Sequence, residues 1–253
     1  MKTKLIMLLA STAALVAFAS PPVAHASLIL VTSTGQPAAT VAQSFVDIGA
    51  QGFGNAPRML TLQTSTVETG SVTPVDVVHN DAISGTDKSS TPTLGSLGWT
   101  SGANVGIGFN SNQTGQTGIT MQSLVLTIYN GTTALGSFSL AAALTPLTFT
   151  AADLALQQGN GNSVFNFGLN AAEQTQFNTI VAAAGSSGFF AGLGSQLGCP
   201  AGAPAGCLPS NDGPDSFIGF AQPGSVPVPE PSTMAVLGIG LLGLGALARR
   251  RTV

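Results

Sequence analysis

Residues 121–141, MQSLVLTIYNGTTALGSFSLA, alternate between apolar and polar side chains on both sides of an Asn-Gly pair. In an extended strand, every second side chain of 124–128 shares one face, and that face is apolar throughout. Asn130 and Gly131 tolerate the positive φ angles of a tight turn, and Phe138 then begins the apolar face of a return strand. A period of two buries one side of a segment only if that segment lies in a sheet, so this stretch predicts a β-hairpin.

Shorter segments of the same character recur along the chain. They are apolar-rich or alternating and are bounded by turn residues, at 28–32, 59–67, 103–109, 164–169, 189–197 and 216–221. One helix is predicted over 170–184, where Asn170 and Glu173 form an N-cap pair and Gly185 ends the helical spacing. A short helical turn is expected at 151–158. No fixed internal period favours a solenoid, so we predict a mainly β fold: an antiparallel, jelly-roll-like β-sandwich with one or two short helices.

The C-terminal end of the chain has three parts. Alternating prolines predict an extended spacer over 223–232. The apolar segment 233–248 would form a helix of about 22–24 Å, which is short for a hydrocarbon core of about 30 Å but sufficient for a marginal membrane span. Arg249, Arg250 and Arg251 follow at once and should stay cytoplasmic, which leaves the body of the chain outside. The alternative, a core helix with a basic last turn, would lack the polar face of a surface element.

This tail resembles the PEP-CTERM sorting domain of exported proteins from Gram-negative bacteria that make exopolysaccharide. The matching residues are Val228, Pro229, Glu230, Pro231 and Ser232, followed by the apolar stretch and the three arginines. The resemblance implies recognition by an exosortase, a membrane cysteine protease–transpeptidase, and cleavage near Pro229-Glu230-Pro231. On that basis the tail is a transient inner-membrane anchor, and the processed protein ends at the cell surface or outside the cell.

The N-terminus predicts export by the Sec machinery. Lys2 and Lys4 precede an apolar run, and Ala24-His25-Ala26 forms an A-x-A cleavage site, so the mature chain should begin at Ser27. An uncleaved anchor is the alternative. The predicted organisation is a signal peptide at 1–26, an ectodomain at 27–222, a linker at 223–232, a transmembrane helix at 233–248 and a basic tail at 249–253.

The charge distribution excludes one class of partner. Arg58 and Lys88 are the only basic residues between the two sorting segments, whereas all ten acidic residues lie in that interval and its linker, which gives a net charge of −8 with His79 neutral. Binding to a phosphate backbone needs clustered lysine and arginine, so we expect no nucleic-acid partner. The chain has 32 glycines, and a polar, weakly charged composition of this kind suits a β-domain outside the cell.

Cys199 and Cys207 are the only cysteines of the chain. Outside the cytoplasm we expect them to form a disulfide. The closed loop is short, so the bridge should contribute at most about 2–3 kcal/mol in the loop-entropy account. A zinc site is the weaker alternative, because one histidine remains after removal of the signal peptide.

Few residues suggest catalysis, and we predict that the protein is not an enzyme. His79 lies near Asp76 and Asp81, so a base role is conceivable, although a lone loop histidine is usually solvated. The chain has no G-x-S-x-G or H-E-x-x-H motif. A pair of carboxylates for sugar hydrolysis would leave no mark in one sequence.

Two acidic loops could supply oxygen ligands to calcium. The first has Asn211, Asp212 and Asp215, and the second has Asn80, Asp81 and Asp87. Turn chemistry without a metal explains the same residues, so no cofactor is assigned and calcium is the alternative.

Trp99, the only tryptophan, could stack against a sugar ring, although packing in the core is the favoured interpretation. The body, chiefly 122–221, also resembles domains that often precede this tail and mostly lack an assigned activity; the matching pieces are 124–140, 171–184 and 213–220. We therefore predict an exported, non-enzymatic protein of the cell surface or extracellular matrix. The alternatives are a lectin-like module that binds exopolysaccharide and, with less support, a glycan hydrolase.

Overall fold

The computed structural model describes residues 27–48, 56–74, 76–85, 87–113, 117–157, 163–211 and 213–222. The predicted signal peptide, linker, membrane helix and basic tail lie outside these ranges. Within the described ranges, every helix is too short or too polar to span a bilayer.

The described residues form a mainly β fold, as predicted. The strands are β1 (Ser27–Leu30), β2 (Phe45–Asp47), β3 (Arg58–Leu62), β4 (Val67–Thr73), β5 (Val77–Asn80), β6 (Val105–Asn110), β7 (Ile119–Asn130), β8 (Thr133–Leu140), β9 (Leu147–Phe149), β10 (Ser163–Leu169), β11 (Phe190–Gly198) and β12 (Asp215–Ala221). The α-helices are α2 (Leu94–Leu97), α3 (Ala151–Leu154) and α4 (Ala171–Val181). One-turn 3-10 helices are η1 (Ala42–Ser44), η3 (Gly102–Asn104), η5 (Ala142–Leu144), η6 (Ala155–Gln157) and η7 (Ser186–Gly188).

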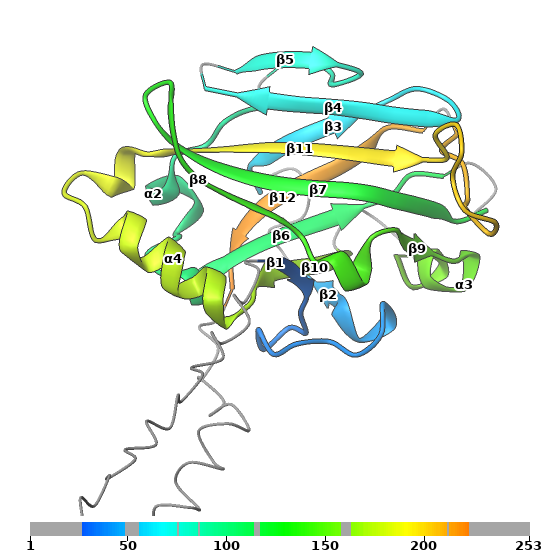
Figure 1. Ribbon diagram of the computed structural model, residues 1–253, viewed down its shortest axis with the longest axis horizontal. Coiled ribbons are helices and arrows are strands. Elements are labelled where there is room, and N and C mark those ends of the chain that lie inside the picture. The colour runs from blue at the N-terminus through cyan, green and yellow to red at the C-terminus, as the bar shows by residue number, and fades with distance from the viewer. Residues whose placement is uncertain are drawn as a thin grey trace, which may run out of the picture.

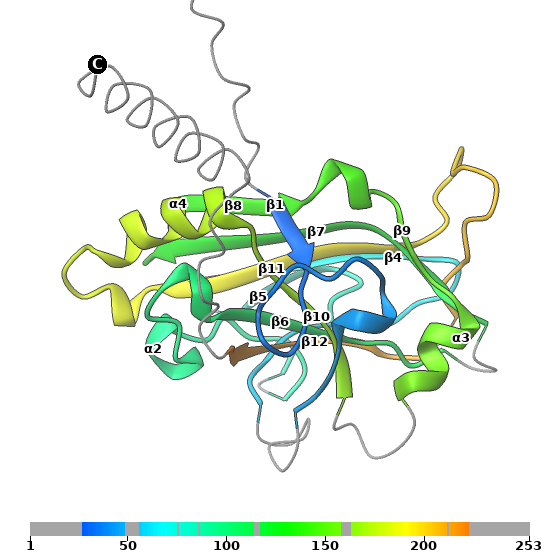
Figure 2. The same ribbon diagram turned by 90° about the horizontal axis from the view of Figure 1, so that it is seen from below.

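All twelve strands belong to one hydrogen-bonded sheet, in the order β3-β12-β6-β10-β1-β8-β7-β11-β4-β5, with β2 paired to β10 and β9 paired to β7. The sheet curls, so that β7, β11 and β4 form one layer and β6, β12 and β3 face them across the core (Figures 1 and 2). The strand β3, at one end of the order, packs against β4 and β11, which lie near the other end. The predicted jelly-roll-like sandwich is therefore not confirmed: the two layers belong to a single curled, open sheet.

The short strand β1 connects the two layers. It pairs antiparallel with β10 on one side and parallel with β8 on the other. The main-chain N–H of Ala141 donates to Leu28 O at 2.9 Å, and that of Asn170 donates to Ser27 O at 3.3 Å. Leu28 and Leu30 point into the core and are 0% and 4% exposed. Both edges of β1 are thus hydrogen-bonded, and its two core-facing leucines are buried.

The interior of the curl is built from the alternating apolar residues. Phe109, Phe165 and Phe217, from β6, β10 and β12, lie on the inner face with Phe149 of β9. Their ring centroids are 5.0 Å apart for Phe109–Phe149, 4.9 Å for Phe109–Phe217 and 4.8 Å for Phe149–Phe165. Such contacts typically add about 0.5–1.5 kcal/mol per pair beyond area burial.

The predicted hairpin is confirmed as β7 and β8. Leu126 and Phe138 face each other across the ladder, and both are fully buried. Asn130 pairs with Thr133, and Gly131 at the turn has φ 57, a left-handed conformation that glycine adopts at low cost.

The predicted helix is also confirmed, although it ends earlier, at Val181. Asn170 and Glu173 form the expected capping box of α4. The predicted turn at 151–158 is present as α3 and η6, and α3 begins with a second capping box between Thr150 and Asp153. The helix α2, capped by the side chain of Thr93, was not predicted.

One predicted strand is wrong. The segment 59–67 is not continuous, because β3 ends at Leu62 and Thr66 adopts φ 76 in the turn before β4. The strands β2, β4, β5 and β9 were missed because they are short or rich in glycine and polar residues. In β4 the buried positions are Glu68, Gly70 and Val72, and a Cβ on Gly70 would lie 2.6 Å from Leu62 Cδ2. The glycine therefore lets β3 and β4 approach closely.

Leu28→Ala tests the packing of β1. We expect a loss of about 2–5 kcal/mol in the free energy of unfolding, because a fully buried leucine is truncated to leave a cavity. Leu135→Ala in β8, at a side chain that is 40% exposed, is the matched control and should cost less than about 1 kcal/mol. Urea denaturation measures both, and equal losses for the two variants would contradict the burial of β1.

Candidate functional site

Two carboxyl groups lie buried at the end of the sheet where β4 and β12 begin, on the right in Figure 1. They belong to Glu68 and Asp215, which are both 0% exposed. The main chain of Asn112 and the side chain of Gln113 donate to the two oxygens of Asp215, each at 2.8 Å. Thr64 N–H donates to Glu68 Oε1 at 3.1 Å, whereas Glu68 Oε2 is buried and receives no hydrogen bond. Both oxygens of Asp215 are therefore occupied, and one oxygen of Glu68 is not.

Burial raises the pKa values of both groups. Burial, followed by the nearby negative charge of Asp215, raises the pKa of Glu68 to about 8. Burial also raises the pKa of Asp215 to about 6, although hydrogen bonds from Asn112 and Gln113 oppose the shift. At neutral pH Glu68 is therefore protonated and Asp215 is ionised. The negative charge of Asp215 favours the protonated form of Glu68, so the two acids hold one proton between them.

The chain around this pair is tightly packed. A Cβ on Gly213 would lie 1.6 Å from Asn112 O, so only glycine allows the loop before β12 to lie against the segment after β6. Asn211 N–H donates to Gln113 Oε1 at 3.0 Å, which connects the same two segments. The acid pair and these contacts join three segments that lie far apart in the sequence: 64–68, 112–113 and 211–215.

A third buried acid lies at the start of α4. Glu173 Oε2 accepts from Asn170 N–H at 3.3 Å, and its other oxygen is buried without a hydrogen-bond partner. Burial raises the pKa of Glu173 to about 8, against a smaller lowering by Asn170. This residue was predicted as a helix cap, and its burial was not.

The predicted calcium ligands do not converge. Asp215 faces the interior with both oxygens occupied, and the side chain of Asn211 donates to Thr117 Oγ1 at 3.4 Å. Asp212 lies outside the described residues. Nowhere in the described ranges do three or more His, Cys, Asp or Glu side chains gather as metal ligands would. A calcium site in this loop stays a prediction.

The two acids near His79 have other partners, and a calcium site at Asn80, Asp81 and Asp87 stays a prediction. Asp76 accepts hydrogen bonds from the main chain and hydroxyl of Thr91, and Asp81 accepts from Thr69 N–H at 2.8 Å. His79 is exposed on β5, where its Nε2 lies 3.4 Å from Thr73 Oγ1. The two acids thus bind other residues and do not orient the histidine as a base.

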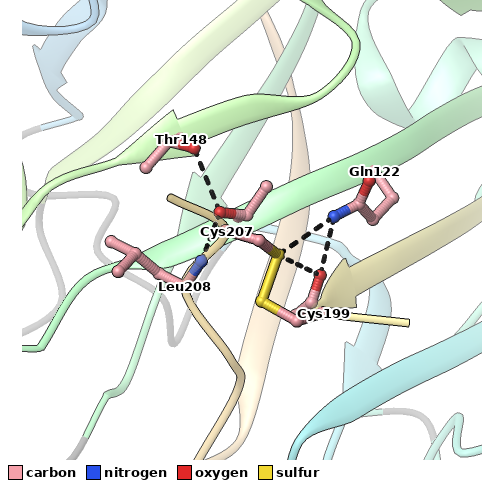
Figure 3. The surroundings of a disulfide bond; sticks show 7 residues. Gln122, Thr148, Cys199, Cys207 and Leu208 are labelled. Atoms are coloured by element: carbon pink, nitrogen blue, oxygen red, sulfur yellow. Dashed lines mark hydrogen bonds between the residues drawn. A yellow bond between two sulfur atoms is a disulfide. The ribbon is translucent and has the colours of Figure 1, made fainter. Parts of the chain in front are cut away.

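The predicted disulfide is confirmed between Cys199 and Cys207, whose Cα atoms are 5.8 Å apart (Figure 3). Gln122 Nε2 donates to Gly198 O at 2.8 Å and approaches Cys207 Sγ at 3.4 Å. Leu208 N–H, just after the bridge, donates to Thr120 Oγ1 of β7 at 2.9 Å. The bridge therefore fixes the 199–207 loop against β7, near the end of the sheet that holds the acid pair.

Trp99 is 2% exposed and belongs to the core. Its Nε1 donates to Phe220 O at 2.9 Å, and its ring meets Phe177 of α4 edge-on at 6.4 Å. A side chain this deeply buried cannot stack against a sugar, so the carbohydrate alternative for Trp99 is wrong, and the favoured interpretation, packing in the core, is confirmed.

A hollow of about 700 Å³ lies on the outer face of the sheet, between β2, β12 and α2. Its lining includes none of Glu68, Asp215, His79 and the two cysteines. These candidate catalytic groups therefore do not line the hollow.

The sorting residues, namely Ala24, Ala26, Val228–Ser232 and Arg249–Arg251, lie outside the described residues. Residues 227–251 match the family profile described as the PEP-CTERM protein-sorting motif. No curated protein and no solved structure matches the chain. The family match thus covers the C-terminal tail and not the β-domain.

The shared proton predicts a dependence of stability on pH. Folded Glu68, with a pKa of about 8, keeps a proton that the unfolded chain, with the ordinary value of 4.5, releases. The contribution of Glu68 to the free energy of unfolding should therefore be most favourable below pH 4.5. It should fall as the pH rises to about 8, by up to about 1.4 kcal/mol per pH unit. Glu68→Gln keeps a neutral donor beside Asp215, so urea denaturation at pH 5 to 8 should show a shallower slope.

Asp87→Asn is the control, because it removes one carboxylate at an exposed position. It should leave the slope as in the natural chain. Glu173 remains in all variants and keeps part of the dependence. An unchanged slope in Glu68→Gln would exclude proton uptake by Glu68.

Proposed function

We propose that this chain, an exported protein whose PEP-CTERM motif at 227–251 directs processing by an exosortase, is a non-enzymatic component of the cell surface or extracellular matrix. The motif implies a membrane-anchored intermediate before processing. The role of the β-domain after processing is the proposal. Its main support is that Glu68 and Asp215, the two acids that lie together, are buried out of reach of a substrate.

The burial of the acid pair argues against a glycan hydrolase. Glycosidases place two carboxyl groups on either side of the scissile bond, within reach of substrate. Glu68 and Asp215 are both 0% exposed, and hydrogen bonds from Asn112 and Gln113 occupy the oxygens of Asp215. A substrate would have to unfold this end of the sheet to reach them. Their contacts fit a structural role in joining β4 to β12.

The end of the folded domain suits processing close to the domain. Gln222 N–H donates to Asn104 O at 2.9 Å, and Gln222 is buried, so the chain is fixed to the sheet up to this residue. Residues 223–229 separate Gln222 from Glu230. Even when fully extended, such a linker reaches only about 25 Å. The exosortase would therefore act beside the folded domain, and the released product would carry little free chain.

Replacing both Glu230 and Pro231 with alanine tests the sorting role. We expect the variant to accumulate in the inner membrane, because the apolar segment 233–248 would still insert while recognition at the motif is lost. Fractionation and immunoblotting of the producing cells measure this. Pro223→Ala, a linker proline outside the matched residues, is the control and should be processed normally.

Release of the double variant equal to that of the natural chain would contradict sorting through Glu230 and Pro231. The proposal that the protein is not an enzyme has a separate test. Reducing ends released from the cells' polysaccharide by the purified protein would contradict it.

A further inference from the structure

The hollow on the outer face of the sheet has a mixed lining. Val46 and Phe220 contribute apolar walls, and Ser33, Asp47 and Ser96 contribute polar groups. Asn166, on the outward-facing side of β10, lies at its base and is 1% exposed. The volume of about 700 Å³ falls within the range of small-molecule sites, which is about 300–1,000 Å³.

The orientation of Asn166 is fixed by a chain of hydrogen bonds. Gln222 Nε2 donates to Val105 O and Phe167 O, which can only accept, so Gln222 Oε1 must face the other way. That oxygen accepts from Asn166 Nδ2 at 3.2 Å, and the same Nδ2 approaches Thr32 O at 3.4 Å. The nitrogen of Asn166 is therefore committed to the protein, and the amide cannot be flipped without losing these contacts.

The remaining polar atom, Asn166 Oδ1, is buried and has no hydrogen-bond partner. Leaving a buried acceptor unpaired typically costs about 1–3 kcal/mol. A ligand that donates a hydrogen bond to Oδ1 would remove this cost. The base of the hollow therefore selects for a donor, such as a hydroxyl group.

We propose that this hollow binds one unit of a neutral saccharide, with a sugar hydroxyl donating to Asn166 Oδ1 and the ring packing beside Phe220. The inference goes beyond the proposed function, which concerns sorting and the role of the buried acids. It also differs from the site predicted at Trp99, which lies in the core.

Charge and polarity select this ligand class. The described lining contains no Lys, Arg or His to balance an anion. A purely apolar ligand would leave Oδ1 unpaired. A pyranose ring carries hydroxyl donors at its rim and apolar C–H groups on its faces, so it matches both the polar base and the apolar walls.

The chain contains its own reporter for this site. Trp99 is the only tryptophan, and its indole N–H donates to Phe220 O. A ligand that packs beside Phe220 should therefore change the tryptophan emission, even though Trp99 itself is buried.

The test uses the processed protein recovered from outside the cell. Maltotriose, cellotriose and N,N′,N″-triacetylchitotriose are the neutral probes, trigalacturonate is the anionic probe, and glucose is the free monosaccharide. Titration calorimetry and Trp99 fluorescence measure binding. We expect saturable binding of at least one neutral trisaccharide with a dissociation constant below about 1 mM, and at least tenfold weaker binding of trigalacturonate. Trisaccharide binding at least as tight as glucose binding indicates a polymer unit as the natural ligand, and tighter glucose binding indicates a free sugar.

Ser96→Tyr fills the hollow from an exposed position and should weaken binding at least tenfold. Thr132→Tyr, at the exposed turn of the β7–β8 hairpin, is the matched control and should bind within twofold of the natural chain. Asn166→Leu removes the acceptor and should also weaken binding tenfold; its urea midpoint shows whether it folds, and Ser96→Tyr decides the outcome if it does not. Absence of saturable binding to all three neutral probes, or unchanged binding by Ser96→Tyr, would overturn the proposal without affecting the sorting result.

Discussion

A strand of four residues holds the two layers of this protein together. The main chain of β1 is paired with β10 on one side and β8 on the other, and Leu28 and Leu30 fill the core between them. Without β1, β10 and β8 would each present an unpaired edge. Glu68 lies beside Asp215 because β3 pairs with β12, with Leu62 opposite Asp215, and a short turn leads from Leu62 to the start of β4.

The two ends of the sheet have different chemistry. At one end, several chain segments are joined by the disulfide loop, by the close approach at Gly213 and by the pair of Glu68 and Asp215, which holds one proton. Towards the other end, Gln222 closes the domain and orients Asn166 beneath the hollow. The linker starts directly after Gln222. A rigid domain with its attachment point beside its binding hollow would suit a protein that is delivered at the membrane and then holds a surface polymer.

Local signals were sufficient for some predictions. The hairpin of β7 and β8, the Asn170–Glu173 cap and the Cys199–Cys207 bridge each depend on residues close in sequence. The continuity of the sheet depends on pairings between distant segments, which periodicity does not encode. An alternating segment predicts a buried face, but it does not say which strand lies beside it.

The candidate site was also predictable only in part. Asp215 was singled out as a metal ligand because it follows a turn-rich acidic loop, but its neighbours Asn112 and Gln113 lie about a hundred positions away in the chain. Glu68 was missed because VETGSVT is rich in polar residues and glycine and its apolar residues do not alternate; its burial does alternate, which places Glu68 on the same face as Val72. The burial of Trp99 was the favoured interpretation, but its partners Phe177 and Phe220 lie far away in the chain and could not be predicted.

The central claim is that β1 is an integral, doubly paired strand. Native-state hydrogen exchange of the processed protein tests it most directly, through two amides. Ala141 N–H donates to Leu28 O in β1, and Val31 N–H, directly after β1, donates to Asn166 O in β10. The account predicts that these amides exchange only on global unfolding, with the same free energy as amides in the middle of β7. Exchange of Ala141 and Val31 through a local opening, at a free energy well below that of β7, would show that β1 frays independently and would contradict the account.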